Sequence, residues 1–283
     1  MENPAVANIE IVIEYIENHL NDKLTLETVA EAVHFSKYHL HRMFTEITGM
    51  TIHDYIQRRQ LTEAAKLLVF SDKPIIDIAF FCGYESQQAF SAAFKSMYKF
   101  PPAEYREKSI FYPLQLRFSL YCKNTECGFV KSDIRPAVPD DLPAWIELMR
   151  LVIDGYPVMD ETDYKNNLIR CIAEKRALVL EDGSTMIGAM MFSHDSGSIE
   201  FLGIHPQYRR KGIQKLFLDV LLEVYLPGRE ICMTTFREGD KADTGHRKLL
   251  KQLGFAEREL LVEFGYPTQR FVYPPDREQK EET

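Results

Sequence analysis

Residues 35–68 read FSKYHLHRMFTEITGMTIHDYIQRRQLTEAAKLL, and residues 73–106 read KPIIDIAFFCGYESQQAFSAAFKSMYKFPPAEYR. The two stretches and the residues just before them repeat one pattern of apolar and turn positions. The matched residues, 49 or 50 positions apart, are Val29-Ala30 with Ile78-Ala79, His34-Phe35 with Gly83-Tyr84, and Leu40, Phe44, Met50 and Tyr55 with Phe90, Phe94, Phe100 and Tyr105. Such self-similarity predicts two copies of one helix-turn-helix unit. The alternative is a chance coincidence of helical periodicity.

The second helix of each copy is predicted to bury one stripe and expose a polar face. The buried stripes are Leu40, Met43 and Phe44 in the first copy, and Phe90, Ala93, Phe94 and Met97 in the second. The exposed faces carry Lys37, Tyr38, His41 and Arg42, and then Gln87, Gln88, Ser91 and Lys95. Neither 36–45 nor 86–99 contains an acid, although the chain has 42.

Gln and Arg are suited to reading base edges in the major groove, because each can form two hydrogen bonds to one base. A long helix from Thr51 to Phe70 is predicted to separate the copies, with some of Arg58, Arg59 and Lys66 binding phosphates. The alternative is an all-helical interaction module with a solvated polar face.

The two quoted runs closely resemble the two halves of the AraC/XylS-type DNA-binding domain. The resemblance implies an all-α domain that places two recognition helices in successive major grooves of double-stranded DNA. By position, Tyr38, His41 and Arg42 read bases from the first helix, and Gln87, Gln88 and Ser91 from the second. The chain departs from the family at Ala92, where Arg is frequent, and at His41, where Gln is common.

Composition and charge limit the alternatives. The chain has 283 residues, which suggests two domains, and 45% of them are apolar, as in ordinary globular proteins. The net charge is −8, with 11 basic and 15 acidic residues in 1–110 and 23 and 27 in the remainder. Neither half has a basic coat, so any affinity for DNA must depend on where the charges lie. The five cysteines are scattered, which favours reduced thiols and a cytoplasmic protein.

No membrane segment is expected, since no apolar run approaches 18 residues and Glu10, Glu14 and Glu17 interrupt the first apolar stretch. After about residue 130, short β-rich runs alternate with helical patterns, which predicts an α/β domain. These runs are 133–138, 177–181, 186–192, 198–204, 230–235 and 259–264. The expected organisation is a DNA-binding domain over 1–108, an arm over 109–131, a second domain over 132–275 and a tail over 276–283. Leu114, Leu116, Phe118 and Leu120 alternate, which predicts a strand-like arm with one buried face.

Residues 198–217, SIEFLGIHPQYRRKGIQKLF, read as a strand, a basic loop and a helix. Arg209, Arg210, Lys211 and Gly212 lie where the helix begins. Backbone amides at a helix N-terminus bind phosphate, and glycine lets the backbone approach it closely. Without further context, a loop of solvated charges explains the pattern equally well.

This run, with GHRKLLKQLGF over 245–255, resembles the GNAT family of N-acetyltransferases. The resemblance implies an α/β fold with a mixed, mostly antiparallel sheet, and acetyl-CoA or another acyl-CoA as substrate or ligand. It assigns the CoA pyrophosphate to the basic loop and the amides of Arg210, Lys211, Gly212, Ile213 and Gln214, and the pantetheine arm to the backbone of Leu202, Gly203 and Ile204.

Two positions depart from the GNAT pattern. Gln214 replaces a small residue and crowds the phosphate, and Leu250 stands where a Tyr often serves as general acid. Glu200, on the expected strand face of Leu202 and Ile204, is a candidate general base for an amine. It is equally well explained as an ion-paired surface residue.

No metal site is predicted, because Cys122 and Cys127 lack partner ligands at zinc spacing. The sequence therefore predicts a bacterial-type transcription regulator that binds promoter DNA and uses its GNAT-like domain as a sensor of acyl-CoA or a small amine. Leu250 and Gln214 favour the sensor. Glu200 and the basic loop favour the alternative, an active N-acetyltransferase whose DNA-binding half regulates a linked gene. A third reading, an enzyme with a vestigial helical half, conflicts with the intact acid-free faces.

Overall fold

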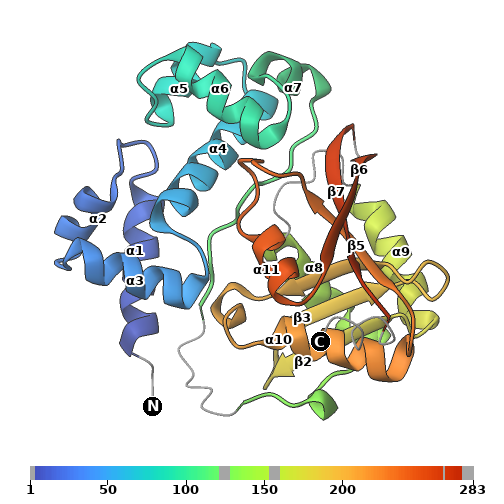
Figure 1. Ribbon diagram of the computed structural model, residues 1–283. Coiled ribbons are helices and arrows are strands. Elements are labelled where there is room, and N and C mark those ends of the chain that lie inside the picture. Colours follow the sequence, from blue (N-terminus) through green and yellow to red (C-terminus); the bar gives the residue numbers. More distant parts are fainter. Residues whose placement is uncertain (1–3, 121–127, 153–159, 264, 276–283) are drawn as a thin grey trace. The chain divides into compact units, whose positions relative to one another are not determined.

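The computed structural model describes residues 4–120, 128–152, 160–263 and 265–275 (Figure 1). The described chain divides into two compact units, the first containing residues up to 120 and the second those from 128 onward. The first unit consists of helices, and the second packs helices against β-sheets, as predicted.

The first unit contains seven α-helices within the described residues. They are α1 (Pro4–Asn18), α2 (Leu26–Ala32), α3 (Lys37–Thr48), α4 (Ile52–Phe70), α5 (Ile75–Phe81), α6 (Gln87–Tyr98) and α7 (Pro102–Lys108). Thr25 caps α2, because its hydroxyl accepts a hydrogen bond from the Thr28 amide at 3.2 Å and the Thr28 hydroxyl accepts one from the Thr25 amide at 2.9 Å.

The two helix-turn-helix units, α2–α3 and α5–α6, are built alike. Each turn contains a left-handed residue, His34 with φ 59° and Gly83 with φ 78°. The next amide then bonds back to the preceding helix, from Phe35 to Ala30 at 2.9 Å and from Tyr84 to Ala79 at 3.0 Å. The serine hydroxyls of Ser36 and Ser86 cap α3 and α6. The sequence repeat is therefore a repeat of backbone geometry.

Glycine is required in the second turn for a reason beyond its φ angle. A Cβ on Gly83 would lie 2.9 Å from the carbonyl oxygen of Asp22, in the loop after α1. The side-chain amide of Gln60 donates to the carbonyls of Leu20 and Asp22 at 3.1 and 3.3 Å. The second turn thus rests on a loop of the first half, which α4 also holds.

Of the three α4 cations among which phosphate contacts were predicted, Arg58 and Arg59 are buried, at 1% and 7% exposure, and so are not available to phosphate. Arg59 donates to the Glu17 carboxylate at 2.7 and 2.8 Å and to the Gln115 carbonyl at 3.1 Å. A paired guanidinium inside the unit is stable there because its partners replace the water it loses. Lys66, the third cation named on α4, is exposed.

The arm over 109–120 is not a strand, which corrects the prediction from its alternating pattern. It is held by single hydrogen bonds rather than by a ladder. The Leu114 and Gln115 amides donate to the Thr62 hydroxyl at 3.1 and 3.2 Å. Leu114 and Phe118 are buried, and Phe118 stacks on Tyr55 with ring centroids 4.9 Å apart. The expected buried face is present. Residues 121–127, which complete most of the expected arm, lie outside the described residues.

The second unit contains two antiparallel sheets, with strand orders β1-β2-β3-β4 and β5-β7-β6. Its strands are β1 (Arg135–Pro136), β2 (Ala177–Asp182), β3 (Thr185–Phe192), β4 (Ile199–Ile204), β5 (Ile231–Phe236), β6 (Ala256–Glu263) and β7 (Tyr266–Tyr273). Its helices are α8 (Leu142–Val152), α9 (Glu161–Ala173), α10 (Ile213–Val220) and α11 (His246–Gln252), with short 3-10 turns at Lys131–Asp133, Pro139–Asp141 and Pro206–Tyr208 and a π-helical turn at Leu221–Tyr225. The central strand of the second sheet, β7, is not among the strands predicted from the sequence.

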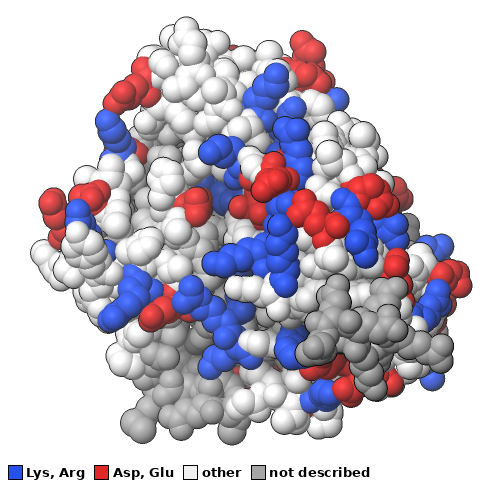
Figure 2. Space-filling model, viewed as in Figure 1, with Lys and Arg blue, Asp and Glu red and all other residues white. Residues whose placement is uncertain are grey.

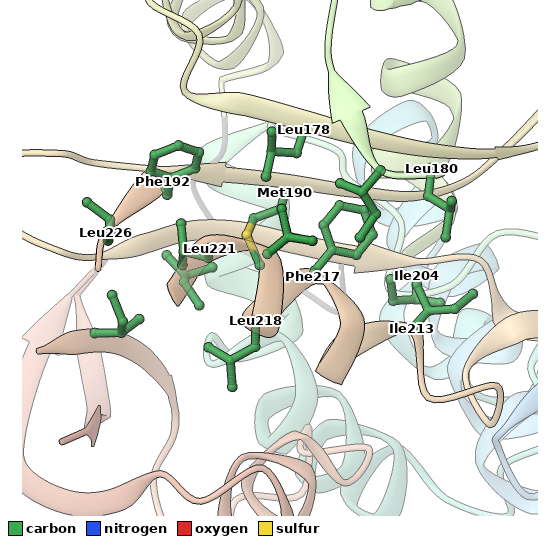
Figure 3. Packing of buried hydrophobic residues seen from close by; sticks show 14 of the residues in the cluster. Leu178, Leu180, Met190, Phe192, Ile204, Ile213, Phe217, Leu218, Leu221 and Leu226 are labelled. Atoms are coloured by element: carbon green, nitrogen blue, oxygen red, sulfur yellow. The ribbon is translucent and has the colours of Figure 1, made fainter. Parts of the chain in front are cut away.

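The core of the second unit positions α10 against the first sheet. Phe217 of α10 and Leu221 after it pack toward Leu178 and Met190 on the strands (Figure 3). Gly188 makes this possible, because a Cβ there would lie 2.7 Å from the Phe217 ring. The seating of α10 fixes the basic loop that precedes it.

Strands β4 and β5 meet at one end only. Ser198 and Cys232 form an isolated parallel bridge, and the Cys232 amide donates to the Gly197 carbonyl at 3.0 Å. A Cβ on Gly197 would lie 2.4 Å from the Glu230 carbonyl oxygen, so the two chains approach closely here. Beyond this bridge the described strands join different sheets. One edge of β4 therefore pairs with β3, and the other has no strand partner among the described residues.

Candidate functional sites

The polar face of α3 is exposed as predicted, and it carries Lys37, Tyr38, His41 and Arg42. Tyr38 is 80% exposed, so its ring is accessible on this face. Lys37 contacts the Glu27 carboxylate at 3.4 Å. On the opposite face, Leu40 and Phe44 are fully buried and hold the helix in place.

The corresponding face of α6 exposes Gln87, Gln88 and Lys95, while Ser91 is half-buried. Phe90 and Phe94 anchor this helix from the inside at 0% exposure. Ala93, predicted in the buried stripe, is only half-buried. The two helices thus present matched faces, one with cations and an aromatic ring, the other mainly with amides.

Figure 2 shows Lys and Arg side chains interspersed with Asp and Glu over the face in view, not a continuous basic coat. Any anion-binding site must therefore be local.

The loop before α10 has the geometry of an anion cradle. Gly212 is the N-cap of α10 with φ 72°, and a Cβ there would meet no atom within 4 Å. Among the described residues, no side chain caps the first turn of α10. The amides of that turn, including those of Ile213 and Gln214, have no acceptor within the helix. Arg210 and Lys211 are exposed beside them, and Arg209 is half-buried.

Two details of this loop differ from expectation. Gln214 is buried at 7% exposure, and its side-chain amide donates to the Arg209 carbonyl at 3.3 Å. Because the Gln214 side chain is buried and holds the loop through the Arg209 carbonyl, it does not crowd the exposed side of the loop. The Lys211 amide donates to the Tyr208 carbonyl at 3.0 Å, which commits it to the turn.

The backbone of Leu202, Gly203 and Ile204 lies on β4, where the strand diverges from β5. Gly203 has a packing role, because a Cβ there would lie 2.5 Å from the Phe201 ring and 2.8 Å from Val152. The free edge offers main-chain donors and acceptors to an extended ligand.

Glu200 occupies a β-bulge. Met191 pairs with Phe201, and the next residue, Phe192, pairs with Ile199, so Glu200 is skipped. The bulge interrupts the alternation, and Ile199 rather than Glu200 joins the core that contains Ile204. The expectation that Glu200 shares their face is therefore incorrect. Its side chain is about one-third exposed and lies 3.8 Å from the Arg176 guanidinium.

Leu250 is buried in the core of the second unit at 3% exposure. Its position thus serves packing. Arg176 is not among the site residues predicted from the sequence, because its partners, the Phe192 carbonyl and the Glu200 carboxylate, lie 16 and 24 residues further along the chain. The sequence offers one indication of a special role for Arg176, which is a charged residue directly before a buried strand.

The described residues contain no group of His, Cys, Asp or Glu side chains suited to a metal ion. Cys122 and Cys127 lie outside the described residues. In the part of the chain that the structure describes, no helix has the length and apolar character needed to cross a bilayer.

Comparison with known proteins divides the chain in the same way. Residues 29–108 match a family model described as a helix-turn-helix domain, and residues 145–255 match the acetyltransferase (GNAT) family. The HTH-type transcriptional regulator YbfP of Bacillus subtilis is 42% identical over 98 residues, which are 35% of this chain and 33% of that protein. The chain thus spans about a third of the length of YbfP.

The multiple antibiotic resistance protein MarA of Escherichia coli is 39% identical over 104 residues, 37% of this chain and 82% of MarA. A GNAT-family acetyltransferase structure from Bacillus cereus is 17% identical, with a TM-score of 0.40, and covers 50% of this chain and 96% of its own.

Proposed function

Because the chain belongs to the AraC-type helix-turn-helix family and carries a GNAT-family domain, we propose that it is a sequence-specific transcription regulator whose GNAT domain binds an acyl-CoA or a small amine as a sensed ligand. The pair of exposed, acid-free helix faces on turns of equal geometry supports the DNA-binding part most strongly.

In this proposal α3 and α6 enter successive major grooves of double-stranded DNA. Tyr38, His41 and Arg42 read the first half-site, with Lys37 at its border. Gln87, Gln88 and Ser91 read the second, with Lys95 toward the phosphates. Arg42 forms hydrogen bonds with a guanine and the glutamines form them with adenines, since their donors and acceptors match those base edges.

The second unit fits a CoA ester at two places. The open left-handed cap at Gly212, with uncapped amides behind it and cations beside it, suits a pyrophosphate. The edge of β4 at Leu202–Ile204 suits the amides of a pantetheine arm, which pair like a short strand. Acetyl-CoA is the simplest ligand of this class.

The test is ligand-induced stabilisation of the full chain by acetyl-CoA. At about 100 times its Kd, the ligand should add about 2.7 kcal/mol to the unfolding free energy of the GNAT unit. Gly212→Val should remove this gain, because a β-branched side chain is strained at φ 72° and fills the cradle.

Gly183→Val is the matched control, since Gly183 has φ 64° and equally open surroundings in the hairpin between β2 and β3. It should destabilise the unit but keep the acetyl-CoA response. Unfolding curves that ignore saturating acetyl-CoA in the parent chain would reject the ligand assignment.

A second candidate function is N-acetyl transfer from acetyl-CoA to a small amine. The bulge favours it, because a bulge at a strand edge re-aims a side chain, and here that side chain is the Glu200 carboxylate. Glu200 then accepts the amine proton as general base. Acetylation assays over a panel of amines test this function, and Glu200→Gln should lower kcat.

A further inference from the structure

The guanidinium of Arg176 lies at the bulge that exposes Glu200. It donates to the Phe192 carbonyl at 2.8 Å, and Phe192 is the β3 residue at which the register with β4 shifts. A bulge leaves main-chain groups without ladder partners. Arg176 supplies a donor at that point and so completes the hydrogen bonding of the distorted strand pair.

Arg176 is itself fixed from several sides. Its amide donates to the Cys171 carbonyl at 2.8 Å, and its carbonyl accepts from the Phe192 amide at 3.1 Å. Its side chain is 12% exposed and binds the Glu174 carboxylate at 2.7 Å. A nearly buried cation with this many partners has little freedom to move.

The same guanidinium contacts two carboxylates of different character. Glu174 is about half exposed in the loop before β2, whereas Glu200 lies on the bulge, 3.8 Å from the nearest guanidinium nitrogen. The Glu174 contact is made to a half-exposed carboxylate and is only one of several that hold Arg176, beside its backbone bonds and the Phe192 carbonyl. The Glu200 contact joins the anchored cation to the strand edge where β4 leaves β5.

We propose that Arg176 is the positioning residue for Glu200: it completes the bulge through the Phe192 carbonyl and holds the Glu200 carboxylate at the β4 edge. This inference rests on the proposed acetyl transfer. In that reaction the amine nitrogen bonds to the acetyl carbon as the bond from that carbon to the CoA sulfur breaks. The amine proton passes to Glu200 and then to solvent, and the CoA thiolate takes a proton from solvent.

Steady-state acetyl transfer by the full chain tests the proposal with Arg176→Gln, Arg176→Lys, Glu200→Gln and Glu174→Gln. Arg176→Gln should lower kcat by about 10- to 100-fold, part of the 100-fold or more expected for loss of a general base. The KM for acetyl-CoA should stay within about twofold, because Arg176 lies outside the CoA-binding residues named above. Arg176→Lys should recover part of kcat, and Glu174→Gln, the matched control, should keep nearly all of it.

The decisive comparison is the double variant. If Arg176 acts through Glu200, adding Arg176→Gln to Glu200→Gln should cost almost nothing more, because coupled residues are not additive. An additive loss, or an unchanged kcat in Arg176→Gln, overturns the inference.

A separate readout keeps the inference distinct from the proposed activity. If the parent chain transfers no acetyl group to any amine of the panel, the activity fails. The placement of Glu200 is then read from its side-chain carboxyl NMR signal, identified by its loss in Glu200→Gln. That signal should move in Arg176→Gln and stay in Glu174→Gln; a signal unmoved in Arg176→Gln overturns the positioning role.

Discussion

At the scale of single residues, the arginines of the first unit are either exposed or buried, depending on what packs around them. Arg42 lies on the exposed face of α3, while Arg59 is enclosed by Glu17 and the arm. The sequence places all of these arginines on helices and marks α4 as a spacer. It does not show that the arm covers one face of α4, since the arm is separated from Arg59 by more than 50 residues.

Arg42→Ala should weaken binding to the specific promoter by about 1–3 kcal/mol if Arg42 grips a base edge. The measurement is a DNA titration against promoter and random duplexes at fixed salt. Lys66→Ala is the control cation, exposed on α4 outside the reading faces, and it should weaken both duplexes alike if it contacts phosphate at all. An equal loss on both duplexes for Arg42→Ala would make Arg42 a phosphate contact.

At the scale of elements, the arm and β7 show what periodicity does and does not determine. The alternation at 114–120 correctly predicts a buried face, yet the arm binds α4 through the Thr62 hydroxyl and the Arg59 guanidinium instead of joining a sheet. The sequence does not predict β7, because Pro267 and the buried polar residues Thr268 and Gln269 are atypical of a central strand. Tertiary packing, which one segment does not encode, decides both cases.

A fragment ending at residue 110 should be less stable than one ending at 120. The longer fragment buries Leu114 and Phe118, each worth about 1.5–3 kcal/mol, and supplies partners for the Thr62 hydroxyl and Arg59. Urea unfolding should therefore separate the two fragments by about 3–6 kcal/mol. Equal midpoints and slopes would show that the arm adds nothing to the helical unit.

The helical unit should also lose stability in alkali. Burial raises the pKa of Tyr84 and of Tyr105 to about 12, above the ordinary value of 10.0. The folded unit holds these protons after the unfolded chain has released them, so stability is complete below about pH 10 and falls as the pH rises toward 12. Each phenol contributes a slope of up to about 1.4 kcal/mol per pH unit.

Urea unfolding of the 1–120 fragment at several pH values measures this slope. Tyr84→Phe should make it shallower, whereas Tyr38→Phe, at an exposed ring, should leave it unchanged. A Tyr84→Phe slope equal to that of the parent fragment would contradict the assignment.

At the scale of the whole molecule, an AraC-type helix-turn-helix unit and a GNAT unit share one chain, and the sensor proposal requires that they communicate. Saturating acetyl-CoA, or an amine of the panel, should change promoter affinity by about 1–3 kcal/mol, the usual range of allosteric coupling. Promoter DNA must then shift the affinity for that ligand by the same factor. DNA titrations with and without ligand measure the effect, and Gly212→Val should abolish the acetyl-CoA response. Identical isotherms alongside robust acetyl transfer would favour an independent enzyme.

The close approach of Gly83 to the Asp22 carbonyl restrains the second helix-turn-helix unit against a loop of the first half. The helices α3 and α6 are also joined by α4 and by the loop after α1, which hydrogen bonds from Gln60 hold to α4. If both helices read DNA as proposed, a fixed spacing makes binding depend on the rotational phase of the two half-sites as well as on their base sequence. One base pair inserted between half-sites turns the second half-site by about a tenth of a helical revolution. Two helices held at a fixed spacing cannot follow that rotation. In the proposed complex, the tolerated spacing of promoter half-sites is therefore limited by a glycine and a carbonyl that contact no base.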